Sequence, residues 1–224
     1  MEVPDEIELT APQARVLGCL IEKRATTPET YPLTLKALVT ACNQTSSRFP
    51  IVDYDAQLVE TTALALKSKA LVRVVHPAHG ERATRYRHVI DEALGLDEAE
   101  LAVFGVLLLR GAQTVAELRT RTERQHSFAG VGEVESVLGS LAARPTPMVQ
   151  HLERQAGQKE TRWIQMIEAD PEGRAAAVPT GGGVAARPAR VDADRVESLE
   201  VRVAALEAQV ARLLDELGID ARSE

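Results

Sequence analysis

The sequence predicts a mainly helical α+β fold built from two copies of one small unit. An internal repeat, a 3% aromatic content and a change of hydrophobic period within each copy lead to this prediction. The stretch 9–20 reads LTAPQARVLGCL, and the stretch 96–107 reads LDEAELAVFGVL. At a constant offset of 87, Leu9, Val16, Gly18 and Leu20 fall on Leu96, Val103, Gly105 and Leu107.

The repeat continues further along the chain at a second offset. Residues 79–90 lie over residues 156–167 at an offset of 77, so the first copy is ten residues longer than the second. The matching positions are Gly80, Thr84, Arg85, Tyr86 and Ile90, which fall on Gly157, Thr161, Arg162, Trp163 and Ile167. Two diverged copies predict two similar domains, at residues 1–95 and 96–169.

Each copy begins with three segments of helical period. In the first copy Thr10 is a plausible N-cap, and a stripe from Val16 to Ile21 follows. In the second copy Asp97 is the cap. The low aromatic content favours helical cores of Leu, Val and Ala. The expected second helices are 33–41 and 115–121, and the expected third helices are 55–69 and 133–143, with Leu58, Leu64 and Leu66 among the apolar positions of the earlier one.

The period then becomes extended in both copies. Residues 71–75 and 84–89 flank a turn at His79-Gly80, and residues 148–152 and 161–167 flank a second turn that also contains glycine. Three helices followed by a hairpin is the order of a winged-helix domain, the helix-turn-helix variant with an added β wing. We therefore expect tandem winged-helix domains.

The tail has a different character. Residues 170–191 are rich in Pro, Gly and Ala and predict a flexible linker. Residues 192–218 predict a coiled-coil helix that pairs in parallel with a second copy, because Arg195 would face Glu200 and Arg202 would face Glu207 of the partner. The alternative is one amphipathic helix that folds back on its own chain. The apolar heptad positions are Val196, Leu199, Val203, Leu206, Val210, Leu213 and Leu217.

Composition limits the class of protein. The start of the chain lacks the features of a signal peptide, and the longest apolar run, residues 101–109, is too short to span a bilayer. We expect a cytoplasmic protein without membrane contact, with Cys19 and Cys42 as buried free thiols. The net charge of −7 counts against nucleic-acid binding, because no large segment is basic overall.

DNA is nevertheless the first partner that the expected fold suggests, with transcriptional regulation as the role. The third helices begin with acidic residues, which repel phosphate, so the candidate contacts lie elsewhere. Base-edge contacts fall on Asn43, Gln44 and Arg48, although such residues also favour turns. The phosphate candidates are Arg82, Arg85, Arg87, Lys159 and Arg162 in the hairpins and Arg119, Arg121 and Arg124 after the second helix of the second copy.

The alternative function is a protein-interaction scaffold without DNA binding, which the acidic third helices and the negative charge fit better. An enzyme is not expected, because the sequence has no phosphate-binding loop, nucleophile elbow or metal-ligand spacing. We expect no catalytic residues, no metal site and no cofactor. A regulator that responds to a small molecule would use a cleft between the two domains.

Several ordered motifs resemble one known family. They include VLGCLIEK at residues 16–23, TTP at 26–28, YPL at 31–33, ACNQ at 41–44 and LLRGAQT at 108–114. These strings are similar to those of the YceH family of uncharacterised bacterial proteins, over about residues 8–168. The resemblance implies a tandem winged-helix fold and no established activity. The linker and heptad segment look like an addition to the family core.

Overall fold

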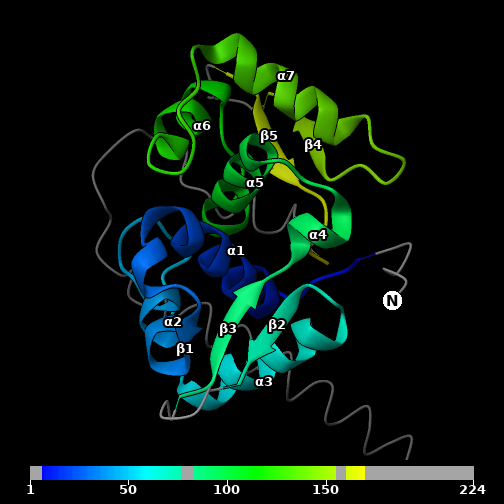
Figure 1. Ribbon diagram of the computed structural model, residues 1–224. Helices are drawn as coiled ribbons and strands as arrows, with labels where there is room; N and C mark the ends of the chain where they lie inside the picture. The colour runs from blue at the N-terminus through cyan, green and yellow to red at the C-terminus, as the bar shows by residue number, and fades with distance from the viewer. Residues whose placement is uncertain (1–6, 77–82, 155–159, 170–224) are drawn as a thin grey trace, which may run out of the picture. The chain divides into compact units, whose positions relative to one another are not determined.

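The structure, a computed structural model, describes residues 7–76, 83–154 and 160–169 (Figure 1). About half of these residues are helical, and the rest include small antiparallel sheets. The mainly helical α+β prediction is therefore confirmed at this level. The linker at 170–191 and the heptad helix at 192–218 lie outside the described residues.

The first copy contains the predicted three helices and hairpin. The expected second helix starts two residues late, because Thr34 caps it by accepting from Ala37 N. Asp55 caps the third helix in the same way, from Leu58 N at 2.7 Å. The elements are α1 (Ala11–Thr26), the 3-10 helix η1 (Pro28–Thr30), β1 (Leu33–Thr34), α2 (Leu35–Cys42), α3 (Ala56–Ser68), β2 (Val72–Val75) and β3 (Arg85–His88).

The second copy repeats this order after a short connecting helix, α4 (Ile90–Leu94), which the sequence did not predict. Gly95 ends α4 with a φ of 61°, a left-handed conformation that glycine adopts without strain. The boundary expected between the copies therefore falls on a helix C-cap. The remaining elements are α5 (Glu98–Arg110), α6 (Val115–Thr122), α7 (Val131–Ala142), β4 (Val149–Leu152) and β5 (Arg162–Gln165).

The helix starts are equivalent in the two copies. Thr10 and Asp97, the expected caps of the first helices, both form capping boxes, with Gln13 and Glu100 as the reciprocal partners. In each of these boxes a side chain accepts from the backbone N–H three residues on, and the later side chain accepts from the cap N–H. Local sequence thus fixes where α1 and α5 begin.

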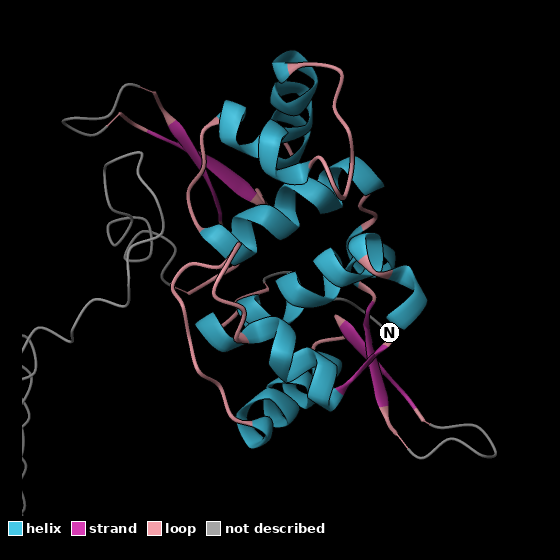
Figure 2. Cartoon of the chain, turned by 90° about the vertical axis from the view of Figure 1, so that its left-hand side faces the viewer, coloured by secondary structure: helices cyan, strands magenta, loops and turns pink. Residues whose placement is uncertain are grey.

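The sheets also match. In the first copy β3 lies between β1 and β2, with Leu33 opposite Tyr86 and Val74 opposite Tyr86 on the other side. In the second copy β5 pairs with β4, and an isolated bridge joins Gln113 to Trp163. Because Trp163 is the repeat equivalent of Tyr86, this bridge corresponds to the β1–β3 pairing. Figure 2 shows the two hairpins on different halves of the molecule.

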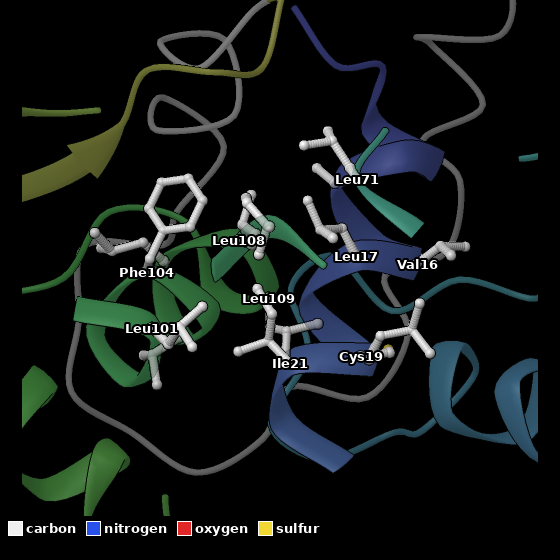
Figure 3. Close-up of a cluster of buried hydrophobic side chains, with 14 of the residues drawn as sticks. Val16, Leu17, Cys19, Ile21, Leu71, Leu101, Phe104, Leu108 and Leu109 are labelled. Atoms are coloured by element: carbon white, nitrogen blue, oxygen red, sulfur yellow. The ribbon is translucent and has the colours of Figure 1, made fainter. Parts of the chain in front are cut away.

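The two copies share one hydrophobic cluster, in which α1 packs against α5 (Figure 3). A Cβ on Gly18 would lie 3.1 Å from Leu108 Cβ, and a Cβ on Gly105 would lie 2.8 Å from Ile21 Cγ2. At the offset of 87, Gly18 is equivalent to Gly105 and Ile21 to Leu108. Each glycine therefore receives the equivalent side chain of the other helix, as in a two-fold symmetric contact.

The long apolar run at residues 101–109 is the buried part of α5, as predicted. None of the helices in the described ranges combines the length and the apolar character that a bilayer crossing requires.

Candidate interaction surfaces

Asn43 and Gln44, two of the three base-reading candidates, make contacts within their own loop. Asn43 Nδ2 donates to Tyr54 O, and Tyr54 N donates to Asn43 Oδ1, both at 2.8 Å. Gln44 Oε1 accepts from Arg48 Nη2 at 2.8 Å. These amides close the loop that precedes α3, which is the turn-forming alternative considered for them.

Arg48, the third base-reading candidate, is buried, and its side chain is 0% exposed. Its guanidinium donates to the two oxygens of Glu22 at 3.1 and 2.6 Å, and Nε donates to Ala41 O at 3.0 Å. Burial alone would raise the pKa of Glu22, but the hydrogen bonds and charge of Arg48 hold it below its usual range. The charge of Arg48 is therefore paired inside the protein, and base contact by Arg48 stays a prediction that this pairing disfavours.

The hairpin arginines hold the sheets to the second helices. Arg85 Nη1 donates to Pro32 O at 3.1 Å, and its repeat equivalent Arg162 donates to Ala112 O at 3.0 Å. Both carbonyls lie two residues before the cap of the following helix. Arg162 also contacts Glu117, at 2.7 Å. The same bond in both copies indicates a structural role.

The remaining hairpin candidates have separate outcomes. Arg85 and Arg87 lie on the less buried face of β3, and Tyr86 lies on the buried face, as the alternation predicts. Arg87 Nη1 forms an ion pair with Glu92 at 3.2 Å. Arg82 and Lys159 lie outside the described residues.

The remaining phosphate candidates are Arg119 and Arg121 in the last turn of α6 and Arg124 just after it. Arg121 pairs with Glu117 at 3.2 Å, one helical turn earlier. Arg119 and Arg124 are exposed, and neither has a hydrogen-bond or ion-pair partner among residues 7–76, 83–154 and 160–169. Of the phosphate candidates that the structure describes, these two have the most freedom to meet an anion.

The exposed face of α3 is mainly apolar and acidic, and its last turn carries one exposed lysine, Lys67. Leu58 and Leu64 are 39% and 45% exposed, and Ile51 in the preceding loop is 46% exposed. The helix buries Val59, Ala63 and Leu66 instead. Asp53, Asp55 and Glu60 are exposed around these side chains. Leu58 and Leu64 were expected among the apolar positions of this helix, and the structure places both outside the core.

The equivalent helix α7 has a different surface. Its exposed positions include Gly132, Glu135, Ser136 and Gly139, and the helix contains no Lys or Arg. Its most exposed apolar side chain is Val131, at 49%. Neither third helix therefore presents a cationic face, and only α3 presents exposed leucines.

Two buried polar groups escaped the sequence analysis. Arg15 is 2% exposed within the apolar run of α1, where its Nη1 donates to Cys42 O at 3.1 Å. His88 is also 2% exposed, and burial lowers its pKa to about 4. The alternation of β3 was the available signal for His88, because it puts His88 on the same face as Tyr86.

The cysteines are as predicted. Cys19 and Cys42 are buried free thiols, and Cys19 Sγ lies 3.3 Å from Ala41 O. Within the part of the chain that the structure describes, no three His, Cys, Asp or Glu side chains gather as a metal site would require. The predicted dimerisation residues 196–217 lie outside that part.

Known proteins similar to the chain carry no functional description. Residues 9–158 match a family described as "Protein of unknown function, DUF480". A UPF0502 protein of Geotalea uraniireducens is 45% identical over 214 residues, covering 94% of this chain and 97% of its own. UPF0502 proteins of Geobacter sulfurreducens and Burkholderia multivorans are 44% and 41% identical, covering 93% and 96% of this chain and 91% of their own in both cases.

The tail is shared with these relatives. Residues 169–224 make up a quarter of the chain, so an alignment that covers 94% of it includes most of this segment. The family model ends at residue 158, so the linker and heptads lie beyond it, and these relatives share most of that segment.

Proposed function

Because the chain belongs to the DUF480 (UPF0502) family, which is described as of unknown function, we propose a function from its own surfaces: a tandem winged-helix module that binds a protein partner through α3. The observation that carries the proposal is the exposed leucine pair of α3, on a helix whose N-cap and first half also expose Asp55 and Glu60. This is the alternative of a protein-interaction scaffold, and the geometry favours it over base-specific DNA binding.

The winged-helix assignment is supported by the repeated order of elements and strand pairings. Each copy has three helices, a hairpin and a short extended segment that pairs with the hairpin just before the second helix. In winged-helix proteins the third helix is the usual contact element. The chemistry of α3 therefore decides what the first copy binds.

The face of α3 suits a protein better than DNA. Thr61 is three residues from both Leu58 and Leu64, so it neighbours each of them on the helix surface, and the two leucines lie about 120° apart around the axis. Exposed leucines of this size gain free energy when a partner covers them. Asp55 and Glu60 would repel phosphate, whereas they attract a positively charged segment. We therefore expect a partner with an apolar centre and a basic rim.

A test follows from two matched surface variants. Leu58→Ser with Leu64→Ser removes the apolar face of α3 without opening the core, and Val131→Ser makes the same kind of change on α7. Tagged proteins are used to isolate partners from cells that express the chain, at low and high salt. We expect one defined partner to be retained by the wild type and by Val131→Ser, and lost from the α3 variant. Equal retention by all three proteins contradicts the proposal.

DNA binding remains a second candidate because Arg119 and Arg124 are exposed and have no partner among the residues that the structure describes. Two such cations would bind the phosphate backbone without reading sequence. Fluorescence anisotropy with duplex DNA at low and physiological salt tests this role. Weak, strongly salt-dependent binding that Arg119→Ala with Arg124→Ala abolishes supports it. No binding at low salt eliminates it.

A further inference from the structure

A cavity of about 270 Å³ lies where the two copies meet. Ile21 of α1 and Leu101 of α5 supply apolar wall, and Arg24, His88, Glu98 and Gln125 supply polar groups. A volume of this size holds a small organic molecule and is near the lower end of known ligand sites. The residues come from both copies, so an occupant touches both.

His88 contributes a buried ring nitrogen without a partner. Its side chain is 1% exposed, and Nδ1 lies 3.3 Å from Asp91 Oδ1. Nδ1 and Asp91 Oδ1 make no hydrogen bond with each other in this geometry, but the nearby carboxylate charge favours the tautomer with the proton on Nδ1, which leaves the lone pair on Nε2. Nε2 makes no hydrogen bond to any residue that the structure describes. Since burial keeps the ring neutral at pH 7, Nε2 is an acceptor.

Gln125 contributes a second acceptor of the same kind. Its Oε1 is buried and has no hydrogen-bond partner within the described ranges. The oxygen lies 3.5 Å from the position that a Cβ on Gly105 would occupy, next to Ile21. A buried acceptor left without a donor costs free energy, which a ligand N–H would recover.

The charges around the cavity favour a cation. Arg24 is hydrogen-bonded to Asp91, so the charges of these two groups offset each other. Glu98 is exposed in the first turn of α5, and its charge also acts on Arg24. Arg24, Asp91 and Glu98 together therefore carry one net negative charge.

We propose that this cavity binds a small organic amine. Its ammonium group donates hydrogen bonds to Gln125 Oε1, His88 Nε2 and Glu98, and its apolar body packs on Ile21 and Leu101. An alcohol of the same shape has one hydrogen-bond donor and no charge. A carboxylate has no donor, and Glu98 would repel it because both groups are negative. The proposal is independent of what α3 binds.

The test uses n-butylammonium as the probe, with 1-butanol and butyrate as controls of similar shape. Binding to the full chain is followed by the NMR signals of the His88 ring, assigned with His88→Gln, during titration to concentrations on the order of 10 mM, which suits so small a ligand. We expect the ammonium to shift these signals saturably, and the two controls to leave them unchanged. No shift with the ammonium, or an equal shift with 1-butanol, overturns the proposal.

A charge variant tests the assigned contact. Glu98→Gln keeps the shape of the side chain, and because Glu98 is exposed, we expect the fold to be retained. The control, Glu135→Gln, makes the same change at an exposed position of α7 that does not line the cavity. We expect Glu98→Gln to weaken ammonium binding about tenfold, because it removes a charge-assisted hydrogen bond. Glu135→Gln should leave it unchanged. Equal affinity in both variants contradicts the role of Glu98 and with it the proposal.

Discussion

Arg48 shows how a basic residue in a polar loop becomes part of the interior. Its guanidinium meets Glu22, Gln44 and the carbonyl of Ala41, so its donors have partners inside the protein. A buried ion pair of this kind adds little net stability, but removing one member leaves an uncompensated charge. The charge of Arg48 therefore has its partner inside the protein, and the cost of breaking the pair, not a surface role, explains why both members are needed.

The pair can be tested by removing one or both charges. Glu22→Gln should lower the free energy of unfolding by about 3–5 kcal/mol, because Arg48 stays charged without its carboxylate. The double variant Glu22→Met with Arg48→Met should lose less than the single one. Glu29→Gln, on an exposed residue, is the control. Urea denaturation measures all four proteins, and an unchanged midpoint for Glu22→Gln rules out a buried pair.

His88 gives the fold a defined pH dependence. Its pKa is about 4 in the folded protein, against an ordinary value of about 6.5. Between these two values the unfolded chain binds a proton that the folded chain does not, so stability falls as pH falls through this window. The loss approaches roughly 3 kcal/mol at the lower end.

Thermal unfolding between pH 7 and pH 4 measures this effect. The wild type and the control His76→Gln, on an exposed residue, should lose stability together, and His88→Gln should show a flatter profile. Asp91 does not explain the loss, because the pKa of its carboxyl is lowered and its contribution is lost only at more acidic pH. Parallel profiles for all three proteins would mean that His88 titrates normally.

For single residues, the sequence predicts burial better than it predicts contact partners. The cysteines are buried thiols as predicted, because a short apolar side chain in an apolar helix has one favourable location. The partner of Arg48 was not predictable, because Glu22 is 26 residues earlier in the sequence and lies on α1. Long-range pairing of charges has no local signature.

At the scale of elements, the two equivalent glycines allow α1 and α5 to approach closely. Gly18 meets Leu108 and Leu109, and Gly105 meets Ile21. The repeat placed these glycines at equivalent positions, and helices make close contact where side chains are smallest. The repeat alone could not show that each glycine faces the other copy, because that depends on how the copies pack.

An alanine scan of three helical glycines tests this contact. Gly18→Ala and Gly105→Ala should each lower the free energy of unfolding by about 1–2 kcal/mol. The added Cβ overpacks the interface, and this cost is larger than the gain from the higher helix propensity of alanine. Gly139→Ala on α7 meets nothing within 4 Å and should raise stability by about 0.5–1 kcal/mol. Equal effects at all three sites in urea denaturation would contradict close packing of α1 on α5.

The positions of the helices and hairpins were largely predictable, but which side of each helix is buried was less so. Capping residues and apolar periods predict α1, α5 and both hairpins, because these signals are local. The short strand β1 and the helix α4 were missed, since two to five residues carry too little pattern. The exposure of Leu58 and Leu64 was also missed, because α3 turns its Val59–Ala63–Leu66 side inward and leaves other leucines unpartnered.

At the scale of the molecule, residues 7–169 share one hydrophobic cluster that includes side chains of both copies. The sequence predicted two domains, and it could not show that their first helices pack together. The backbone adds contacts between the ends, where Leu9 N donates to Ile167 O at 2.6 Å and Ala169 N donates to Leu9 O at 2.9 Å. The first and last described segments are thereby joined.

The heptads at residues 192–218 give a prediction about assembly. If they pair with a second copy, truncation after Ala169 should convert the dimer to a monomer, as measured by analytical ultracentrifugation. Leu206→Arg in the full chain should have the same effect, because it places a charge in the apolar seam. A truncated protein that keeps the larger mass would move the interface to residues 1–169, and two monomeric proteins would favour a helix that folds back.

The most direct test of the account is photo-crosslinking in living cells from position 61 on α3. Thr61 is exposed between Leu58 and Leu64, and its hydroxyl donates to the carbonyls of Gln57 and Leu58 in its own helix. A photoreactive phenylalanine analogue there, with Ser136 on α7 as the matched control position, captures whatever touches α3. The account predicts an adduct that protease destroys and nuclease does not, absent from position 136. A nuclease-sensitive adduct at position 61, or no adduct at all, would contradict the proposal that α3 binds protein.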